Sequence, residues 1–400
     1  MTTAKPKDPI TVENWQHQDN LRWSFQNLSS ILPTSPVSRG GEPTAKLHMM
    51  QMDLGSIELI EKHENEPSLT VRSVIQATNT DGWLVMHRGK VLVEEYFGTM
   101  NSVTDHLLMS VSKTLVGTVA GILNELGKLD LNLPITHYVP ELATSGYAGA
   151  TTRHLLDMRS GIKFSEEYMD PQAEVRLLEQ AIGWAVREDT NPNPAQGMYE
   201  YLATLQAKTE HGGPFEYRSC ETDALGWVCE RAGGKKMQEL LSELIWSQIG
   251  AQQDLVMGTD QFDVGMFDGG FNATLRDLAR FGWIYVNKGV ALNGKKIIDE
   301  AWITDTFTGD PDSRQAFEDS PGDNRMPGGM YRNQIWFPYP GSDVALALGI
   351  HGQMIYMNPN TNTVGVKLSS WPYPQDPGRL FPTIRAFDAI ANHLAATQPA

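Results

Sequence analysis

The 400-residue sequence is poor in cysteine and in positive charge, and each shortage excludes a class of protein. Its two cysteines, Cys220 and Cys229, are nine residues apart, and Cys229 falls in an expected helix, so a disulfide between them is geometrically poor. Two free thiols fit a reducing compartment. The formal net charge is −16, with 32 basic residues against 48 acidic ones. This balance argues against a nucleic-acid partner and against an anionic membrane surface.

Long apolar runs are also missing. The amino-terminal stretch MTTAKPKDPITVENWQHQ lacks the apolar segment of a secretory signal, and no run of about 18 apolar residues could span a bilayer. We therefore expect a cytoplasmic protein. With 40% hydrophobic and 20% charged residues, the chain has the composition of an ordinary globular protein with a sizeable core.

Two kinds of catalytic site lack their sequence signatures. Among the ten histidines, His63, His154, His211 and His351 show no paired metal-ligand spacing, so we expect no metal site. A Ser-His-Asp triad on a nucleophile elbow would need a G-x-S-x-G turn, and the sequence has none.

Strand-like segments bracket a helical middle. The runs WLVMHR and VLVEEYFG flank Gly89-Lys90 and predict a hairpin over 83–98. Short β-rich segments return late in the chain, at 331–337, 345–350, 353–357 and 363–369. Helical periodicity covers 107–126, 154–162, 174–188, 221–234, 269–289 and 382–395.

This order predicts an α/β fold whose sheet is built from both ends of the chain. We expect an extended amino-terminal arm over 1–50, anchored by Trp15, Trp23 and Phe25. The α/β domain is predicted to comprise 51–105 and 265–400, with a mostly helical domain inserted over 106–264.

A serine and a lysine three residues apart, Ser110 and Lys113, lie on the strongest predicted helix. This spacing places the hydroxyl and the amine on one helix face, where a partly desolvated lysine can take the serine proton. Chance supplies about one Ser-x-x-Lys in a chain of this size, and a second match occurs at Ser160 and Lys163. Gly161 breaks any helix there, so only Ser110 and Lys113 remain as a catalytic pair.

A proton shuttle is the next requirement, and tyrosine suits it where neighbouring cations lower its pKa from about 10. Tyr217, in Tyr217-Arg218-Ser219, precedes an expected helix and is the candidate. The other tyrosines considered for this role are Tyr285, Tyr331 and Tyr356. They lie in a predicted helix or beside predicted strands, where packing explains their presence.

The third element is a glycine-broken strand at 349–353, GIHGQ. Such an edge could offer backbone N–H groups to an oxyanion, although a β-bulge is the simpler explanation of the two glycines taken alone.

The order of these parts resembles the serine β-lactamase and penicillin-binding-protein superfamily. The chain looks most like its class C-like esterases and amidases, and in particular the 6-aminohexanoate-dimer hydrolase (nylon oligomer hydrolase) group. The supporting stretches span about residues 80 to 395: GKLDLNLPITHYVPEL, HLLDMRSGI, YRSCETDALGW, DGGFNATLRDLARFG and GIHGQMIYMNP. The resemblance implies an antiparallel sheet flanked by helices with an inserted helical domain.

The resemblance also implies roles for individual residues. Ser110 would be the acylated nucleophile, Lys113 its general base and Tyr217 the proton shuttle, without any cofactor. The oxyanion hole would come from the backbone N–H groups of Ser110 and of the 350–353 edge, with Ile350 as the candidate. Residues expected at the substrate are Tyr168, Trp184, Ser219, Trp336, His351, Gly352 and Gln353, although both tryptophans could equally be core aromatics. Glu179 and Asp170 could attract an amine-bearing substrate, although a solvated helix face explains them more simply.

One departure separates the chain from the antibiotic-recognising members. Those carry Lys-Thr-Gly or His-Thr-Gly on the third-motif strand, whereas this chain has His351-Gly352-Gln353. We therefore expect a cytoplasmic serine hydrolase acting on small linear amides or esters. The alternatives are a carboxylesterase with little amidase activity, a β-lactamase or D-Ala-D-Ala carboxypeptidase, and a catalytically silent binding protein. A homodimer is left open.

Overall fold

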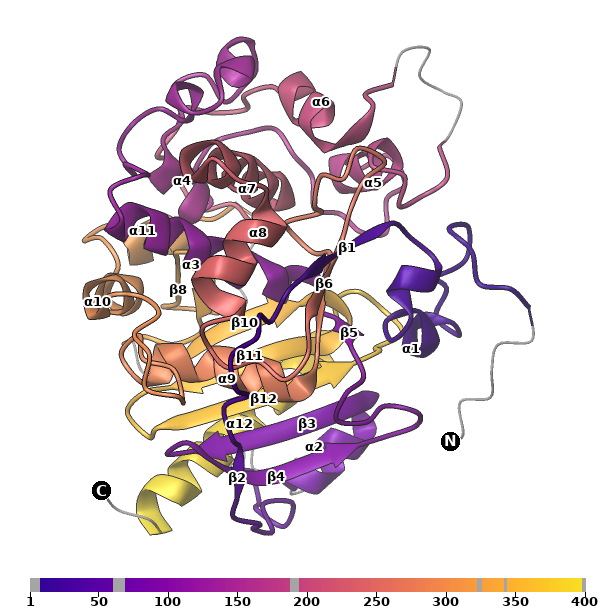
Figure 1. Ribbon diagram of the computed structural model, residues 1–400, viewed down its shortest axis with the longest axis vertical. Helices are drawn as coiled ribbons and strands as arrows, with labels where there is room; N and C mark the ends of the chain where they lie inside the picture. Colours follow the sequence, from indigo (N-terminus) through magenta and orange to yellow (C-terminus); the bar gives the residue numbers. More distant parts are fainter. Residues whose placement is uncertain (1–7, 60–68, 188–193, 322–325, 342–343, 398–400) are drawn as a thin grey trace.

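The computed structural model describes residues 8–59, 69–187, 194–321, 326–341 and 344–397. A large sheet forms the lower half of the molecule in Figure 1, and most of the helices lie above it. The strand order is β2-β4-β3-β12-β11-β10-β9-β8, and every neighbouring pair is antiparallel except β2 and β4. The strands are β2 (His48–Met49), β4 (Lys90–Tyr96), β3 (Thr80–His87), β12 (Thr363–Ser369), β11 (Gln353–Asn358), β10 (Ala345–Gly349), β9 (Ile335–Phe337) and β8 (Met330–Arg332).

The early and late segments meet at the centre of this sheet. β3 pairs with β4 on one side and with β12 on the other, where Leu84 lies opposite Val366. Both faces of β3 are covered, which explains the uninterrupted apolar run from Trp83 to Met86. Leu84 and Met86 point into one core cluster, whereas Trp83 and Val85 point into the other, as the period of two requires.

Helices cover the two faces of the sheet. α9 (Leu275–Val286) packs on β3, β11 and β12, while α2 (Val71–Ala77) and α12 (Pro377–Thr397) pack together on the opposite side. The Thr274 side chain accepts the N–H of Asp277 and so caps α9.

The upper part is mostly helical, but a second sheet joins it to the rest. Its helices are α3 (Ser112–Glu125), α4 (Thr152–Leu156), α5 (Glu174–Ala181), α6 (Gly197–Thr204), α7 (Ser219–Gly233) and α8 (Met237–Leu241). The four-stranded sheet has the order β1-β6-β7-β5, with β1 (Thr34–Val37), β6 (Leu255–Gly258), β7 (Phe271–Ala273) and β5 (His106–Leu107). Short helices α1 (Leu21–Ser24), α10 (Glu300–Thr308) and α11 (Ser313–Glu318) complete the set.

The predicted hairpin and the strand at 363–369 are confirmed. The single strand predicted over 331–337 is wrong in detail. It is the hairpin β8–β9, because Asn333 and Gln334 both have positive φ and form its turn. Strand β6 was not predicted, because four residues are too short to show alternation.

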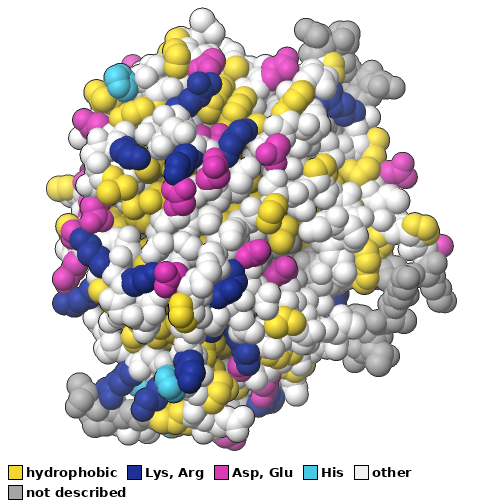
Figure 2. Space-filling model, in the orientation of Figure 1, with side chains coloured by type: hydrophobic (Ala, Val, Ile, Leu, Met, Phe, Trp, Pro, Cys, Tyr) yellow, Lys and Arg dark blue, Asp and Glu magenta, His cyan; other side chains and the backbone are white. Residues whose placement is uncertain are grey.

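Both cysteines are buried free thiols, as expected. Among the described residues, no helix combines the length and apolarity needed to cross a membrane. Acidic and basic side chains are interspersed over the face shown in Figure 2.

Candidate active site

Ser110 lies in a 3₁₀ turn (Met109–Val111) immediately before α3, and not within a continuous helix from residue 107 as predicted. The expected helix start is wrong because residues 106–107 form β5 and Met109 has φ +48°, which no right-handed helix allows. The 3₁₀ turn nevertheless aligns residues three apart. The Nζ of Lys113 therefore lies 3.1 Å from the Oγ of Ser110.

The Lys113 amine is buried and makes three short hydrogen bonds. It donates to the Ser110 hydroxyl, to the Ser219 hydroxyl at 3.0 Å and to the Asp268 carbonyl at 2.8 Å. Asp268 Oδ2 lies further away, at 3.4 Å. Three acceptors match the three N–H bonds of an ammonium group.

The charges around this amine decide its protonation state. Burial lowers the pKa of Lys113, but the acidic groups around it, Tyr217, Asp268, Glu166 and Asp223, together hold that pKa above its ordinary value. Burial raises the pKa of Tyr217 more than Lys113 lowers it. The lowered pKa that would suit a tyrosine proton shuttle is therefore not found at Tyr217 in the free protein. The free protein holds an ammonium beside a neutral phenol.

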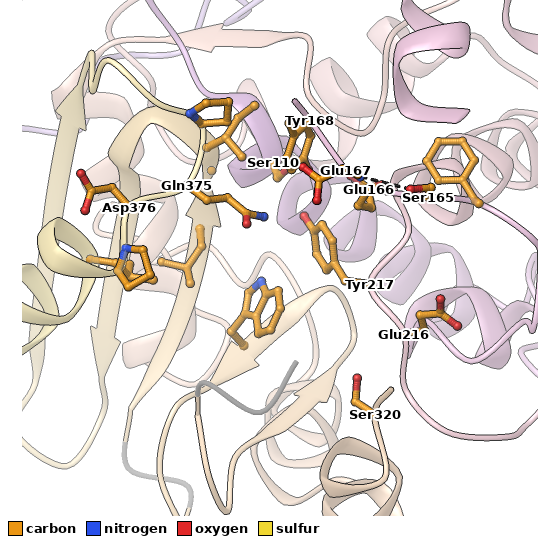
Figure 3. A pocket seen from close by; sticks show the side chains of 18 of the residues that line it. Ser110, Ser165, Glu166, Glu167, Tyr168, Glu216, Tyr217, Ser320, Gln375 and Asp376 are labelled. Atoms are coloured by element: carbon orange, nitrogen blue, oxygen red, sulfur yellow. Dashed lines mark hydrogen bonds between the residues drawn. The ribbon is translucent and has the colours of Figure 1, made fainter. Parts of the chain in front are cut away.

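Tyr217 connects this pair to a large cavity. Its hydroxyl hydrogen-bonds with Ser110, and the Lys113 amine lies 5.3 Å from its ring centroid. Its ring packs on Trp336, with centroids 5.1 Å apart and planes inclined by 30°. In Figure 3 the Tyr217 hydroxyl points toward Ser110 and Glu166.

The cavity has a volume of about 850 Å³ and is bounded by several segments that lie far apart in the sequence. Ser110 and Tyr217 lie beside the loop 163–168, the carboxyl end of β10 and the segment 371–380. The lining includes Glu166, Tyr168 and Gln375, which Figure 3 labels, together with Trp336, Leu348 and Ile350.

Glu166 is the main site residue that sequence reasoning missed. Its carboxylate accepts the backbone N–H of Ser219 and the Tyr168 hydroxyl, and burial raises its pKa despite the nearby Lys113. No periodicity or motif marks it, because it lies in a loop. The only available signal was its position two residues before Tyr168.

Comparison with known proteins agrees with this geometry. The beta-lactamase family profile matches residues 71–389, most of the chain. The chain belongs to the beta-lactamase family. This family member is 36% identical over 387 residues to the 6-aminohexanoate-dimer hydrolase of Paenarthrobacter ureafaciens, covering 95% of both chains. It is a hydrolase of the serine beta-lactamase family, similar to that enzyme.

Solved structures share the fold of this beta-lactamase family member. A Bacillus anthracis protein described as a candidate 6-aminohexanoate-dimer hydrolase superimposes with a TM-score of 0.88 at 26% identity, covering 99% of this chain and all of the other. A family VIII carboxylesterase matches with a TM-score of 0.59 at 17% identity, over 80% of this chain and 96% of its own. At this low identity, the match to the carboxylesterase shows only that the two proteins share a fold.

The residues after Ile350 in this beta-lactamase family site do not face the cavity, so their predicted substrate contacts are wrong. His351 Nδ1 hydrogen-bonds with the Trp371 carbonyl at 2.7 Å, and its ring packs on Phe25. A Cβ on Gly352 would lie 2.2 Å from the Trp371 ring. The Gln353 amide exchanges two hydrogen bonds with the backbone of Ser369. These three residues shape the strand end that presents Ile350.

Two further predicted substrate contacts are also wrong. Trp184 is 1% exposed, packs edge-on against Trp15 and donates its Nε1–H to the Thr259 carbonyl. Ser219 is buried and contacts Lys113 rather than the cavity. Tyr168 and Trp336 do line the cavity.

The serine and the tyrosines that were considered and rejected as catalytic groups have structural roles. Ser160 is buried, away from the cavity, and hydrogen-bonds with Glu221. Tyr285 and Tyr356 hydrogen-bond with Thr118 and Asp388 inside the core, and Tyr331 packs there against Trp336. Within the described ranges, no group of three or more metal-ligating side chains converges.

Proposed function

We propose that the protein is a serine hydrolase that cleaves linear amide or ester bonds through an acyl-enzyme on Ser110. The observation that carries this proposal is the contact of the Ser110 hydroxyl with both Lys113 and Tyr217 at the wall of the cavity. A serine hydroxyl becomes a useful nucleophile only when a neighbouring group accepts its proton. Two such groups are within reach.

The charge states of Lys113 and Tyr217 in the free protein set the order of the acylation steps. Lys113 is an ammonium in the free protein, so it must first release a proton to solvent. Ser110 then attacks the substrate carbonyl while its proton passes to Lys113. The backbone N–H groups of Ser110 and Ile350 would bind the developing oxyanion. Tyr217 gives its proton to the departing amine or alkoxide and regains one from Lys113, so the protons balance.

Deacylation repeats these transfers in the opposite direction. Water replaces the leaving group and attacks the ester carbonyl. It gives one proton to Tyr217, which passes its own proton to the neutral Lys113. The Ser110–acyl bond then breaks, and Lys113 returns a proton to the serine oxygen. Only side chains already in contact are needed, and no cofactor takes part.

The strand end at the cavity lacks the cation that would hold the carboxylate of a β-lactam. The strand end offers Leu348, Gly349 and Ile350, and no lysine stands there to hold a carboxylate. Glu179 is not available to attract an amine, because it is buried and paired with Arg176 at 2.8 Å.

Three alternatives make different predictions. A carboxylesterase would turn over a p-nitrophenyl ester but hardly a linear amide, because only the amide leaving group needs a proton. A β-lactamase would hydrolyse nitrocefin with complete deacylation. A silent binding protein would turn over none of these substrates.

The decisive experiment is mass spectrometry after reaction with a fluorophosphonate probe. We expect the label on Ser110, its loss in Ser110→Ala and its retention in the matched control Ser160→Ala. Labelling of Ser160, or a wild-type protein without any label, would overturn the proposal.

A further inference from the structure

Two buried carboxyl groups lie next to Lys113 but outside the cavity. Asp223 belongs to α7, and Asp268 to the loop before β7. Their side chains are nearly or fully inaccessible to solvent, and neither lines the cavity wall. The proposed reaction does not use them. Burying a carboxyl group away from water costs free energy, so the presence of two such groups here needs an explanation.

The two groups are joined through the main chain. The backbone N–H of Asp268 donates to Asp223 Oδ1 at 3.0 Å, and the N–H of Phe267 donates to the same carboxyl group. Asp268 then presents its carbonyl oxygen to Lys113 at 2.8 Å and its Oδ2 at 3.4 Å. Among the described residues, Asp223 Oδ2 and Asp268 Oδ1 have no hydrogen-bond partner.

One positive charge cannot neutralise all the acids that face it. The Lys113 ammonium is approached by Asp268, Asp223, Glu166 and the oxygen of Tyr217. Burial and the nearby Asp268 raise the pKa of Asp223 well above its ordinary value. Asp223 therefore favours its neutral form, while Asp268 Oδ2, 3.4 Å from the Lys113 amine, forms the ion pair with that amine.

We infer that Asp268 is a positioning residue that holds Lys113 as an ammonium in the free protein, and that Asp223 is its uncharged companion, which fixes the Asp268 main chain. This inference rests on the proposed function, since it concerns the lysine that must lose a proton before Ser110 attacks. Asp268 would thereby determine the pH below which Ser110 does not react.

The test is the pH dependence of Ser110 labelling by a fluorophosphonate, followed by mass spectrometry. Labelling should fall on the acid side as Lys113 becomes protonated. In Asp268→Asn the midpoint of this fall should move about 1–3 pH units lower, since a contacting opposite charge shifts a pKa by about that amount. In Asp223→Asn the midpoint should stay in place, because a neutral amide replaces a neutral carboxyl.

Two controls make the result specific. Asp277→Asn removes a buried carboxylate that pairs with Arg280, away from Lys113, and should leave the midpoint unchanged. Asp268→Ala, which places no amide against Lys113, must move the midpoint in the same direction as Asp268→Asn.

The outcomes separate the two proposals. An unmoved midpoint in both Asp268 variants, or an equal movement in Asp223→Asn, would overturn the inference while Ser110 is still labelled. Absence of any Ser110 label in the wild type would overturn the proposed function instead.

Discussion

The indole N–H of Trp15 donates a hydrogen bond to the carbonyl oxygen of Trp184 at 3.0 Å, and the two rings pack edge to face. The contact fastens the amino-terminal segment to the helical part. The next residue, Gln16, accepts a hydrogen bond from Arg176, which in turn donates twice to the Tyr168 carbonyl. The amino-terminal segment thus reaches the cavity wall through two side chains.

Trp15→Ala should lower the free energy of unfolding by about 3–5 kcal/mol, as expected for deletion of a large buried aromatic. Urea denaturation would measure it. The matched control is Trp23→Ala in the same segment, where the side chain is only half-buried and the loss should be smaller. Equal losses would show that Trp15 is not the principal anchor.

Arg176→Ala should reduce kcat/KM for a linear amide by about 10–100-fold, mainly through KM. It removes the charge-assisted hydrogen bonds that hold the Tyr168 backbone, each worth about 1.5–3 kcal/mol. Steady-state kinetics would measure the change. Arg187→Ala removes an arginine that binds the carbonyls of Gln180, Ala181 and Ala195 and serves as the control. A pure loss of kcat in Arg176→Ala would contradict the positioning role.

Tyr217→Phe should slow amide hydrolysis by about 10²–10⁴-fold, the usual contribution of a general acid, and should spare p-nitrophenyl ester hydrolysis more. The ester leaving group departs without a proton. Paired kcat/KM values for the two substrates would show the difference. Tyr331→Phe, in the neighbouring ring 6.1 Å away, should affect both substrates alike. Equal losses in Tyr217→Phe would refute the shuttle.

The buried His351 should make the fold sensitive to acid. Burial lowers its pKa from 6.5 to about 4. Between these values the unfolded chain binds the proton and the folded chain does not, so stability falls as the pH drops from 6.5 to 4, by up to about 3 kcal/mol. Urea unfolding across this range should show a shallower fall in His351→Gln. An unchanged pH dependence would exclude His351 as its source.

The sequence was most informative where local pattern and tertiary structure coincide. The apolar runs of β3 and β12 predicted the central strands, and the spacing of Ser110 and Lys113 survived the change from an α-helix to a 3₁₀ turn. The convergence of Glu166, Asp223 and Asp268 on Lys113 could not be predicted, because these acids come from distant segments and share no periodicity.

The errors have equally local causes. His351, Gly352 and Gln353 were expected at the substrate because the family resemblance places the third motif there. A strand, however, sends successive side chains to opposite faces, and a positive φ at His351 breaks the alternation. Trp184 resembled a pocket wall because sequence alone does not show that Trp15 covers it.

The pairing of β3 with β12 also has a consequence for synthesis of the chain. β3 leaves the ribosome early together with β4, but its other neighbour, β12, is among the last segments made. At 5–20 residues per second, one apolar edge of β3 waits on the order of tens of seconds for its partner. Exposed apolar edges of this kind promote aggregation. A nascent chain truncated before Thr363 would therefore keep the nucleophile segment but lack the strand that closes the sheet, which makes such fragments natural clients of chaperones.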